Sequence, residues 1–348
     1  TNWQNAAVNI NWIRERSNGR KQTWTLGHSQ YDSDGQFDLR LSRNGPLNLT
    51  LGEASVLQNN QVQHSHFRWH ETKADDQQTL TYGLRAEWDQ VVLNVSNDTS
   101  IVLANDTSQY QVAAFVGKQW LREKWQWQTG VHLTYYSGTQ KVYPSPRISA
   151  SYTLNDSWQL KTALQYQQQF LRAYYHENRF GRSFQIWSLA NDHRQPPAQS
   201  SQIMLGGTWK KGPWLLDIEG YYRYTSGTLE HVSFRSGFDP DSQLPQGSRM
   251  FALFEGNGEV LGLDVLFRYT KGGYQGWLAY TLSRATRTVD PLFQGAAYPS
   301  VDDRRHQLDW VHQYRWKDWR FTAVYVGASG APFLPLADAP RERNSRSA

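Results

Sequence analysis

A two-residue alternation of apolar and polar side chains runs through residues 125–135. Because successive side chains of a strand point to opposite faces, a strand here has one apolar and one polar face. A strand with lipid on one side and a watery lumen on the other needs this pattern over roughly 9 to 11 residues. The segment therefore predicts the wall of an antiparallel transmembrane β-barrel. The apolar or apolar-compatible parity carries Trp125, Trp127, Thr129, Val131, Leu133 and Tyr135, and the other carries Gln126, Gln128, Gly130, His132 and Thr134.

Three further segments repeat the alternation, at residues 158–167, 214–224 and 261–269. Charged side chains such as Lys161 and Arg223 keep to the polar parity. That placement avoids the cost of about 2–4 kcal/mol that an arginine or lysine carries at the bilayer midplane. Lys118 shares the apolar parity, but it lies near a turn, so its stem can carry the charge to the lipid headgroups.

Composition agrees with a barrel. The mean hydropathy of −0.72 leaves no run of about 20 apolar residues for a spanning helix, whereas a barrel wall is polar on one face. The net charge of +5 comes from 36 basic and 31 acidic residues that are interspersed. Nucleic-acid binding would gather basic residues into a patch, and the sequence has none, so no nucleic-acid partner is expected.

Seven short polar turns alternate with long loops rich in Gly, Pro, Asn, Asp and Ser. Two strands per short turn predict about 14 strands, with the short turns on the periplasmic side. Paired aromatic residues flank these turns, as in an interfacial girdle. The turns are residues 17–20, 73–78, 122–124, 155–157, 210–213, 271–273 and 317–318; the long loops are residues 32–60, 172–200, 226–256 and 288–305. The flanking aromatics include Trp120, Trp125, Trp209, Trp214, Tyr269, Tyr274, Trp316 and Trp319.

Residues 61–71 are the weakest predicted strand, because neither parity is cleanly apolar, and part of it is expected above the membrane. The segment holds His64, His66 and His70. At about 3.3 Å per residue, His64 and His70 lie roughly 20 Å apart, so one metal ion cannot bind all three. A His64–His66 pair is left open as an alternative, but no metal site or cofactor is predicted.

The loop after Phe170 is the best candidate for ligand binding, because it combines stacking rings with donors for anionic oxygens. The alternative is a solvated loop that contacts lipopolysaccharide. The acidic and basic residues at 302–306 lack the oriented partner that a nucleophile or base needs, so we predict no catalytic residues and no enzyme. The candidate ligand-binding residues are Arg172, Tyr174, Tyr175, His176, Arg179, Arg182, Trp187, His193 and Arg194.

From Gly262 onward the chain resembles the later barrel strands of TonB-dependent outer-membrane receptors. The match covers about the last quarter of the sequence, and the hairpin rhythm extends the likeness to the rest. The residues that carry it are 262–265 (GLDV), 276–285 (GWLAYTLSRA), 299–308 (PSVDDRRHQL) and 326–333 (VGASGAPF).

The resemblance implies a bacterial outer-membrane barrel of about 22 strands with an N-terminal plug. Extracellular loops would capture a scarce small-molecule nutrient, most commonly a siderophore–iron complex, and the TonB complex would supply energy for import. Residues 1–348 are then expected to be a partial barrel, without the plug and the last strands. Its partners would be outer-membrane lipid and lipopolysaccharide, its own plug domain, the TonB complex and the nutrient.

Two other functions use the same residues. A passive channel of about 14 strands requires only the alternation and a polar lumen. A soluble carbohydrate-binding β-protein or hydrolase could use the 16 tryptophans as sugar platforms. The paired rings beside successive turns favour the membrane proteins over the soluble one.

Overall fold

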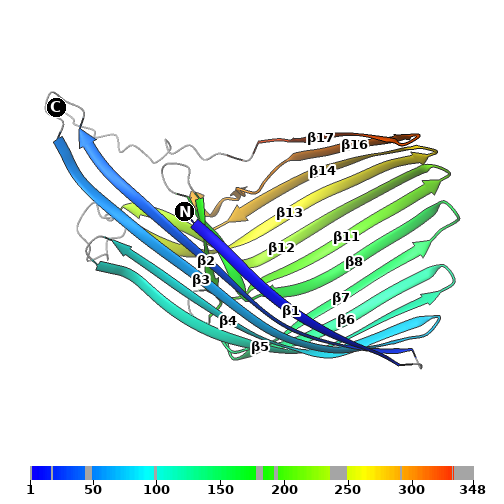
Figure 1. The fold of residues 1–348 in the computed structure, drawn as a ribbon, viewed down its shortest axis with the longest axis horizontal. Helices are drawn as coiled ribbons and strands as arrows, with labels where there is room; N and C mark the ends of the chain where they lie inside the picture. Colours follow the sequence, from blue (N-terminus) through cyan, green and yellow to red (C-terminus); the bar gives the residue numbers. More distant parts are fainter. Residues whose placement is uncertain are drawn as a thin grey trace.

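The computed structural model describes residues 2–16, 19–43, 49–97, 100–177, 183–191, 195–235, 249–290, 292–330 and 332. They form one large, curved antiparallel sheet and one small hairpin (Figure 1). In chain order the sheet contains β1 (Asn2–Arg16), β2 (Arg20–Arg43), β3 (Leu49–Ala74), β4 (Gln78–Asn97), β5 (Ser100–Arg122), β6 (Trp125–Tyr136), β7 (Lys141–Thr153), β8 (Trp158–Gln169), β11 (Ala198–Lys211), β12 (Trp214–Arg235), β13 (Arg249–Lys271), β14 (Tyr274–Thr288), β15 (Tyr298–Pro299), β16 (His306–Trp316) and β17 (Trp319–Ala328). The hairpin contains β9 (Leu171–Glu177) and β10 (Ser183–Leu189), and a 3-10 turn, η1, spans Phe293–Gly295.

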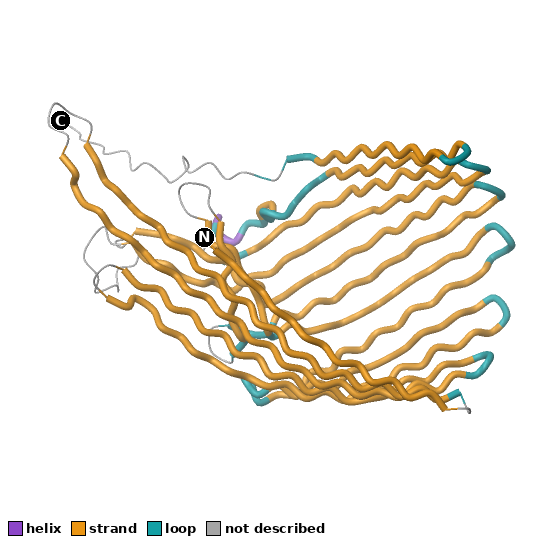
Figure 2. The backbone as a smooth tube through the Cα atoms, viewed as in Figure 1, coloured by secondary structure: helices purple, strands orange, loops and turns teal. Residues whose placement is uncertain are grey.

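Each long strand pairs with the next long strand in the chain, and only the β9–β10 hairpin is skipped, between β8 and β11. Fourteen strands lie on this path, with the short β15 added beside β14, which confirms the predicted strand number. All seven predicted short turns fall between neighbouring strands, and the six that the structure describes in full lie together at one end of the sheet (Figure 2). The part of the chain that the structure describes contains no helix that is long and apolar enough to cross a membrane.

The strand register shows that apolar side chains share one face of the sheet. Ile148, Leu164, Ile203, Tyr222 and Leu261 are cross-strand neighbours across β7, β8, β11, β12 and β13, and each is more than a third exposed. Since cross-strand partners point to the same side, these residues form a continuous apolar band on the outer face. One residue earlier or later, polar groups such as Gln165 and Arg223 occupy the inner face.

Aromatic rings form a belt on the outer face beside the short turns. Trp125 packs on Tyr152 with ring centroids 4.5 Å apart, and Trp214 packs on Tyr269 at 4.3 Å. Trp12 stacks on Trp24 at 4.4 Å at the same end of β1 and β2. Tryptophan and tyrosine favour the level of the lipid headgroups. The belt therefore agrees with the predicted girdle.

Some residues expected in long loops are strand instead. β2 and β3 stay paired out to Arg43 and Leu49, within the predicted loop 32–60, and β12 and β13 extend into the predicted loop 226–256. Pairing satisfies the backbone while the outer side chains stay polar: the Asp32 carboxylate accepts hydrogen bonds from Gln30 at 2.9 Å and Gln61 at 2.7 Å. Composition suggests turns here because Asn, Asp and Gly are depleted in most strands. Strands that have water on both faces nevertheless tolerate these residues.

Residues 61–71 form a regular part of β3. His64, His66 and His70 point to the inner face, whereas Phe67 and Trp69 point outward in register with Leu26 and Trp24 of β2. Neither alternate set of residues looks apolar in the sequence, but in the structure one set forms a polar inner side. The other set forms an outer side that becomes apolar toward the short turns.

Candidate ligand-binding site

The β9–β10 hairpin lies on the inner side of the curved sheet. β9 contacts β12, and β10 contacts β3, β4 and β5, which are many strands away from β12 in the sheet order. One small hairpin reaches both regions only by crossing the concave side. Part of the predicted extracellular loop 172–200 is therefore a structured element directed inward.

Apolar contacts hold β10 against the inner wall. Trp187 and Leu189 pack with Val62 of β3 and Val91 of β4, and both valines are buried. The Trp187 backbone N–H donates to Asn60 Oδ1 at 3.0 Å, and Asn60 is fully buried. Burial of valine, leucine and tryptophan stabilises such a contact by about 1.5–3 kcal/mol for each large side chain. Because Val62 and Val91 interrupt an otherwise polar inner face, they mark the docking place of the hairpin.

A second buried cluster fixes the base of the hairpin. The Tyr136 ring, at the end of β6, stacks on Phe170 with centroids 4.3 Å apart. Its hydroxyl donates to the Ala190 carbonyl oxygen at 2.9 Å. Phe170 and Ala190 flank the two ends of the hairpin, so Tyr136 holds both of its chain connections.

Arg172 joins the hairpin to the opposite part of the wall. Its Nη1 donates to the carbonyl oxygen of Gly227 in β12. Gly227 has a φ of +69°, and an added Cβ would lie 2.9 Å from the Pro197 carbonyl oxygen, so glycine is required at this bulge. Arg172 Nε and Nη2 have no hydrogen-bond partner among the described residues. Burial lowers the pKa of the Arg172 guanidinium to about 10.

The structure describes only some of the predicted ligand-binding residues. Arg172 and Trp187 take part in the contacts above, and both are partly or fully buried. Tyr174, Tyr175 and His176 lie in β9, paired with Ile186, Gln185 and Phe184 of β10, but their side chains are outside the described part. Arg179, Arg182, His193 and Arg194 lie outside the described residues.

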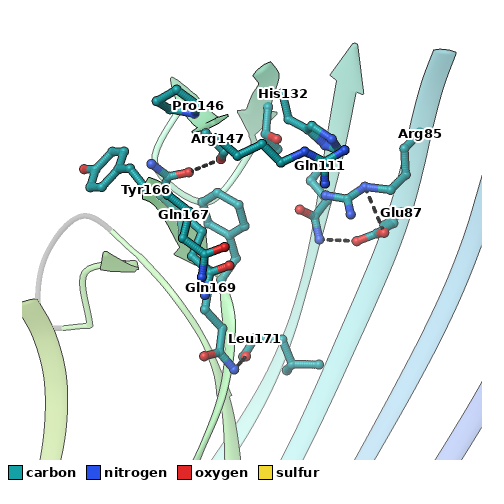
Figure 3. A pocket seen from close by; sticks show the side chains of 15 residues that line it. Arg85, Glu87, Gln111, His132, Pro146, Arg147, Tyr166, Gln167, Gln169 and Leu171 are labelled. Carbon is teal, nitrogen blue, oxygen red and sulfur yellow. Dashed lines mark hydrogen bonds and ion pairs between the residues drawn. The ribbon is translucent and has the colours of Figure 1, made fainter. Parts of the chain in front are cut away.

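A recess of about 370 Å³ opens on the inner wall beside Phe170 and Leu171, where β8 leads into the hairpin (Figure 3). Its lining combines guanidinium, amide, imidazole and carboxylate groups. These come from five neighbouring strands, β4 to β8, so the sequence alone does not group them. The signal is their shared inner parity, which becomes informative once the register is known. The charged and polar lining includes Arg85, Glu87, Gln111, His132, Arg147, Gln165 and Gln167.

Glu87 is the carboxylate in this recess. Arg85 Nε lies 3.1 Å from Glu87 Oε1, and Gln111 Nε2 donates to Glu87 Oε2 at 2.5 Å. The Glu87 carboxylate therefore already has an ion-pair partner and a hydrogen-bond partner. The recess has more guanidinium and amide donor groups than carboxylates. Such a surface can bind anionic or strongly polar solutes.

The histidines of β3 do not converge with other ligands. His64 Nδ1 is 2.7 Å from Asp89 Oδ1, and the His64 and His66 rings are 5.3 Å apart. Within the described ranges, no group of three or more His, Cys, Asp or Glu side chains is placed to hold a metal ion.

The acidic and basic residues at 302–306 have a structural arrangement. Asp303 is buried, and its Oδ1 accepts a hydrogen bond from the Ala285 backbone N–H at 2.8 Å. Its Oδ2 accepts from Arg305 Nη2 at 3.1 Å. Asp303 therefore attaches the loop that precedes β16 to β14.

Several solved structures share this architecture. No family model matches the sequence, and no curated protein matches it. Among solved structures, the copper transporter OprC matches at a TM-score of 0.66 and 12% identity, over 93% of this chain and 52% of its own. The ferripyoverdine receptor of the outer membrane of Pseudomonas aeruginosa matches at a TM-score of 0.63 and 11% identity, over 94% of this chain and 50% of its own. The siderophore receptor PirA from Acinetobacter baumannii matches at a TM-score of 0.60 and 11% identity, over 93% of this chain and 50% of its own.

The fold is that of a TonB-dependent receptor barrel. This confirms the resemblance and the fold class that the sequence predicts. The chain spans about half the length of these solved structures. At this level of identity the likeness establishes the architecture, and the similar proteins are receptors and transporters. In this receptor-barrel fold, the inner face of the sheet corresponds to the lumen.

Proposed function

We propose that this chain is part of the barrel of a bacterial outer-membrane receptor that imports a scarce nutrient. The observation that carries the proposal is the separation of faces: an apolar outer band with an aromatic belt, and a charged inner wall, in the fold of TonB-dependent receptors. Lipid on one face and water on the other is the environment that such a wall requires.

A siderophore–iron complex is the proposed cargo. The names of the similar structures support this class, since they include two siderophore receptors and metal transporters. Aromatic rings and donors for anionic oxygens in the segment that contains Arg172 and Trp187 suit a ligand of this kind. We propose that the predicted ligand-binding residues of this segment contact the cargo as it enters the lumen.

The remaining partners follow from the same proposal. Outer-membrane lipid and lipopolysaccharide would surround the apolar band. A plug domain of the same protein would fill the lumen, and the TonB complex would supply energy for import. The chain is then a partial receptor barrel over residues 1–348.

Cell fractionation and uptake measurements test the function. The full-length protein should be recovered with the outer membrane, and deletion of its gene should abolish uptake of a radiolabelled ferric siderophore under iron limitation. Loss of TonB should reduce that uptake equally. Recovery in the aqueous fraction without detergent, or unchanged uptake across a panel of ferric siderophores, would contradict the proposal.

A passive channel is the alternative, and the polar inner wall is the observation that favours it. Reconstitution of the full-length protein in planar bilayers separates the two functions. A plugged receptor should be nearly silent, whereas steady ion conductance together with TonB-independent uptake would support the channel.

A further inference from the structure

Arg147 lies across a stretch of the inner wall where two neighbouring residues are glycines and carry no side chains. Gly117 of β5, Gly130 of β6 and Arg147 of β7 are consecutive cross-strand partners, so all three share the inner face. A Cβ on Gly130 would lie 3.2 Å from Arg147 Nε, and a Cβ on Gly117 would lie 3.8 Å from Arg147 Nη2. The long side chain of Arg147 therefore lies over the two glycines, and the glycines leave the space that this position needs.

The guanidinium group held there makes no hydrogen bond or ion pair with any described residue, and the residue is exposed. Arg85, on the same face, has an Nε that is also without a hydrogen bond among the described residues, although Glu87 lies at ion-pair distance. Figure 3 shows Arg85, Gln111, His132 and Arg147 directed toward one another at the recess. The Arg147 guanidinium, which has no partner among the described residues, thus lies beside the ion-paired Arg85.

The surroundings add positive charge and rigidity. The His132 ring stacks on Phe115 at 4.9 Å, and the Arg68 guanidinium lies 5.9 Å above the Phe115 ring. Two guanidinium groups line the recess against one carboxylate, and that carboxylate already accepts from Gln111. The described lining of the recess therefore carries one guanidinium group more than it has carboxylates.

We propose that Arg147 and Arg85 form an oxyanion-binding site in the lumen, which takes a carboxylate or phosphate group of a small solute. Guanidinium groups bind such oxygens through pairs of charge-assisted hydrogen bonds. The volume of about 370 Å³ is within the range of small-molecule sites, and Gln165 and Gln167 supply further amide donors and acceptors. This inference rests on the proposed function, because a solute meets the inner face of the wall only where that face lines the path of import.

Calorimetric titration of the full-length protein in detergent with inorganic pyrophosphate tests the site. Pyrophosphate is a small solute that carries paired oxyanions, the chemistry proposed for this site. We expect saturable binding that weakens as the salt concentration rises, since exposed charges are screened. Absence of binding to the folded wild-type protein at low salt would overturn the proposal.

Charge removal at two places locates the binding. Arg147→Gln should weaken pyrophosphate binding at least tenfold. Arg268→Gln removes the same charge from the inner face of β13, near the short turns and away from the recess, and should leave the affinity within about twofold. Equal weakening by both variants would show a diffuse field effect and refute a built site.

The two glycines give a test that keeps every charge. Gly130→Ala places a methyl group 3.2 Å from Arg147 Nε and 3.1 Å from the Val116 carbonyl oxygen, so Arg147 must move and binding should weaken severalfold. Gly117→Ala meets its nearest atom at 3.4 Å, an ordinary contact, and should bind as the wild type does. Unchanged affinity in both variants, with the barrel shown folded by its heat-dependent electrophoretic mobility, would contradict the placement of Arg147.

Fractionation and siderophore uptake report on the proposed function separately. A protein that imports a ferric siderophore but does not bind pyrophosphate refutes the anion site alone. A protein that binds pyrophosphate through Arg147 but transports no siderophore supports the site and refutes the proposed cargo.

Discussion

Arg172 of the inner hairpin donates a hydrogen bond to the carbonyl oxygen of Gly227 in β12. This contact connects the hairpin to a part of the wall far from the β3–β4 surface on which β10 packs. The β-bulge at Gly227 provides the acceptor, because the register shifts between Ser226 and Thr228. The hairpin is thereby fixed at two places across the lumen.

Replacement of Arg172 by methionine should release the hairpin without unfolding the barrel. The substitution removes the link to β12 but also removes two buried donors that lack described partners, so these effects on global stability oppose each other. We expect faster amide hydrogen exchange over residues 171–189 and an unfolding free energy changed by less than about 1 kcal/mol. Arg284→Met, at an exposed outer position of β14, is the control. Wild-type exchange rates in Arg172→Met would show that the contact does not hold the hairpin.

Asn60 should be important for the second attachment. Its side chain accepts from the Trp187 N–H and donates to the Val92 carbonyl oxygen at 3.3 Å, in a fully buried position. Asn60→Ala leaves these groups unsatisfied and should destabilise the docked hairpin by about 1–3 kcal/mol. Hydrogen exchange at Trp187 measures the change. Asn59→Ala removes an exposed contact to Asp34 on the opposite face and should have little effect. Similar effects of both substitutions would argue against the specific role of Asn60.

The strand order and the two faces of the sheet are predictable from sequence because the side-chain period of a strand is two. A one-residue slip would move Leu164 to the inner face and Gln165 to the outer face, so the apolar outer face fixes the register. The short turns are equally informative, since Gly212 and Gly272 have positive φ values that favour glycine.

The inner hairpin and the recess follow from contacts between distant strands, which no local pattern encodes. Leu171 and Trp187 belong to a segment with the composition of a binding loop. The inward direction of this segment depends on packing with Val62, Val91 and Tyr136, which lie far away in the chain. The extent of β2 and β3 is also unpredictable from composition, since a strand with water on both faces loses the period-two signal.

Lipid exposure of the outer face can be measured with two adjacent residues of β11. Leu205 is 61% exposed on the outer face, whereas Met204 points to the inner face. Leu205→Arg should destabilise the folded barrel by about 2–4 kcal/mol in lipid vesicles, and Met204→Arg should cost much less, because its charge remains in water. Urea unfolding of both variants provides the comparison. Equal losses of stability would mean that the two faces meet the same environment.

The β3–β4 turn should depend on pH through Asp75. Its Oδ1 accepts from the backbone N–H groups of Gln77 at 2.9 Å and Gln78 at 2.8 Å, and its Oδ2 accepts from the Gln78 side chain at 3.0 Å. The Gln77 N–H, followed by the Gln78 side chain and N–H, lowers the pKa of this carboxyl group below its ordinary value. Since the folded pKa is depressed, the stabilisation is fully present above the unfolded-state value of about 3.9 and is lost as the pH falls through the lower folded pKa.

The protection factors of the Gln77 and Gln78 amides should therefore be constant near neutral pH and should fall on acidification below about 3.9. Asp75→Asn keeps an oxygen acceptor that does not titrate, so its protection should vary little with pH, whereas Asp75→Ala should lose protection at every pH. Hydrogen exchange followed by mass spectrometry measures all three proteins. A wild-type pH profile identical to that of Asp75→Asn would show that ionisation of Asp75 does not stabilise the turn.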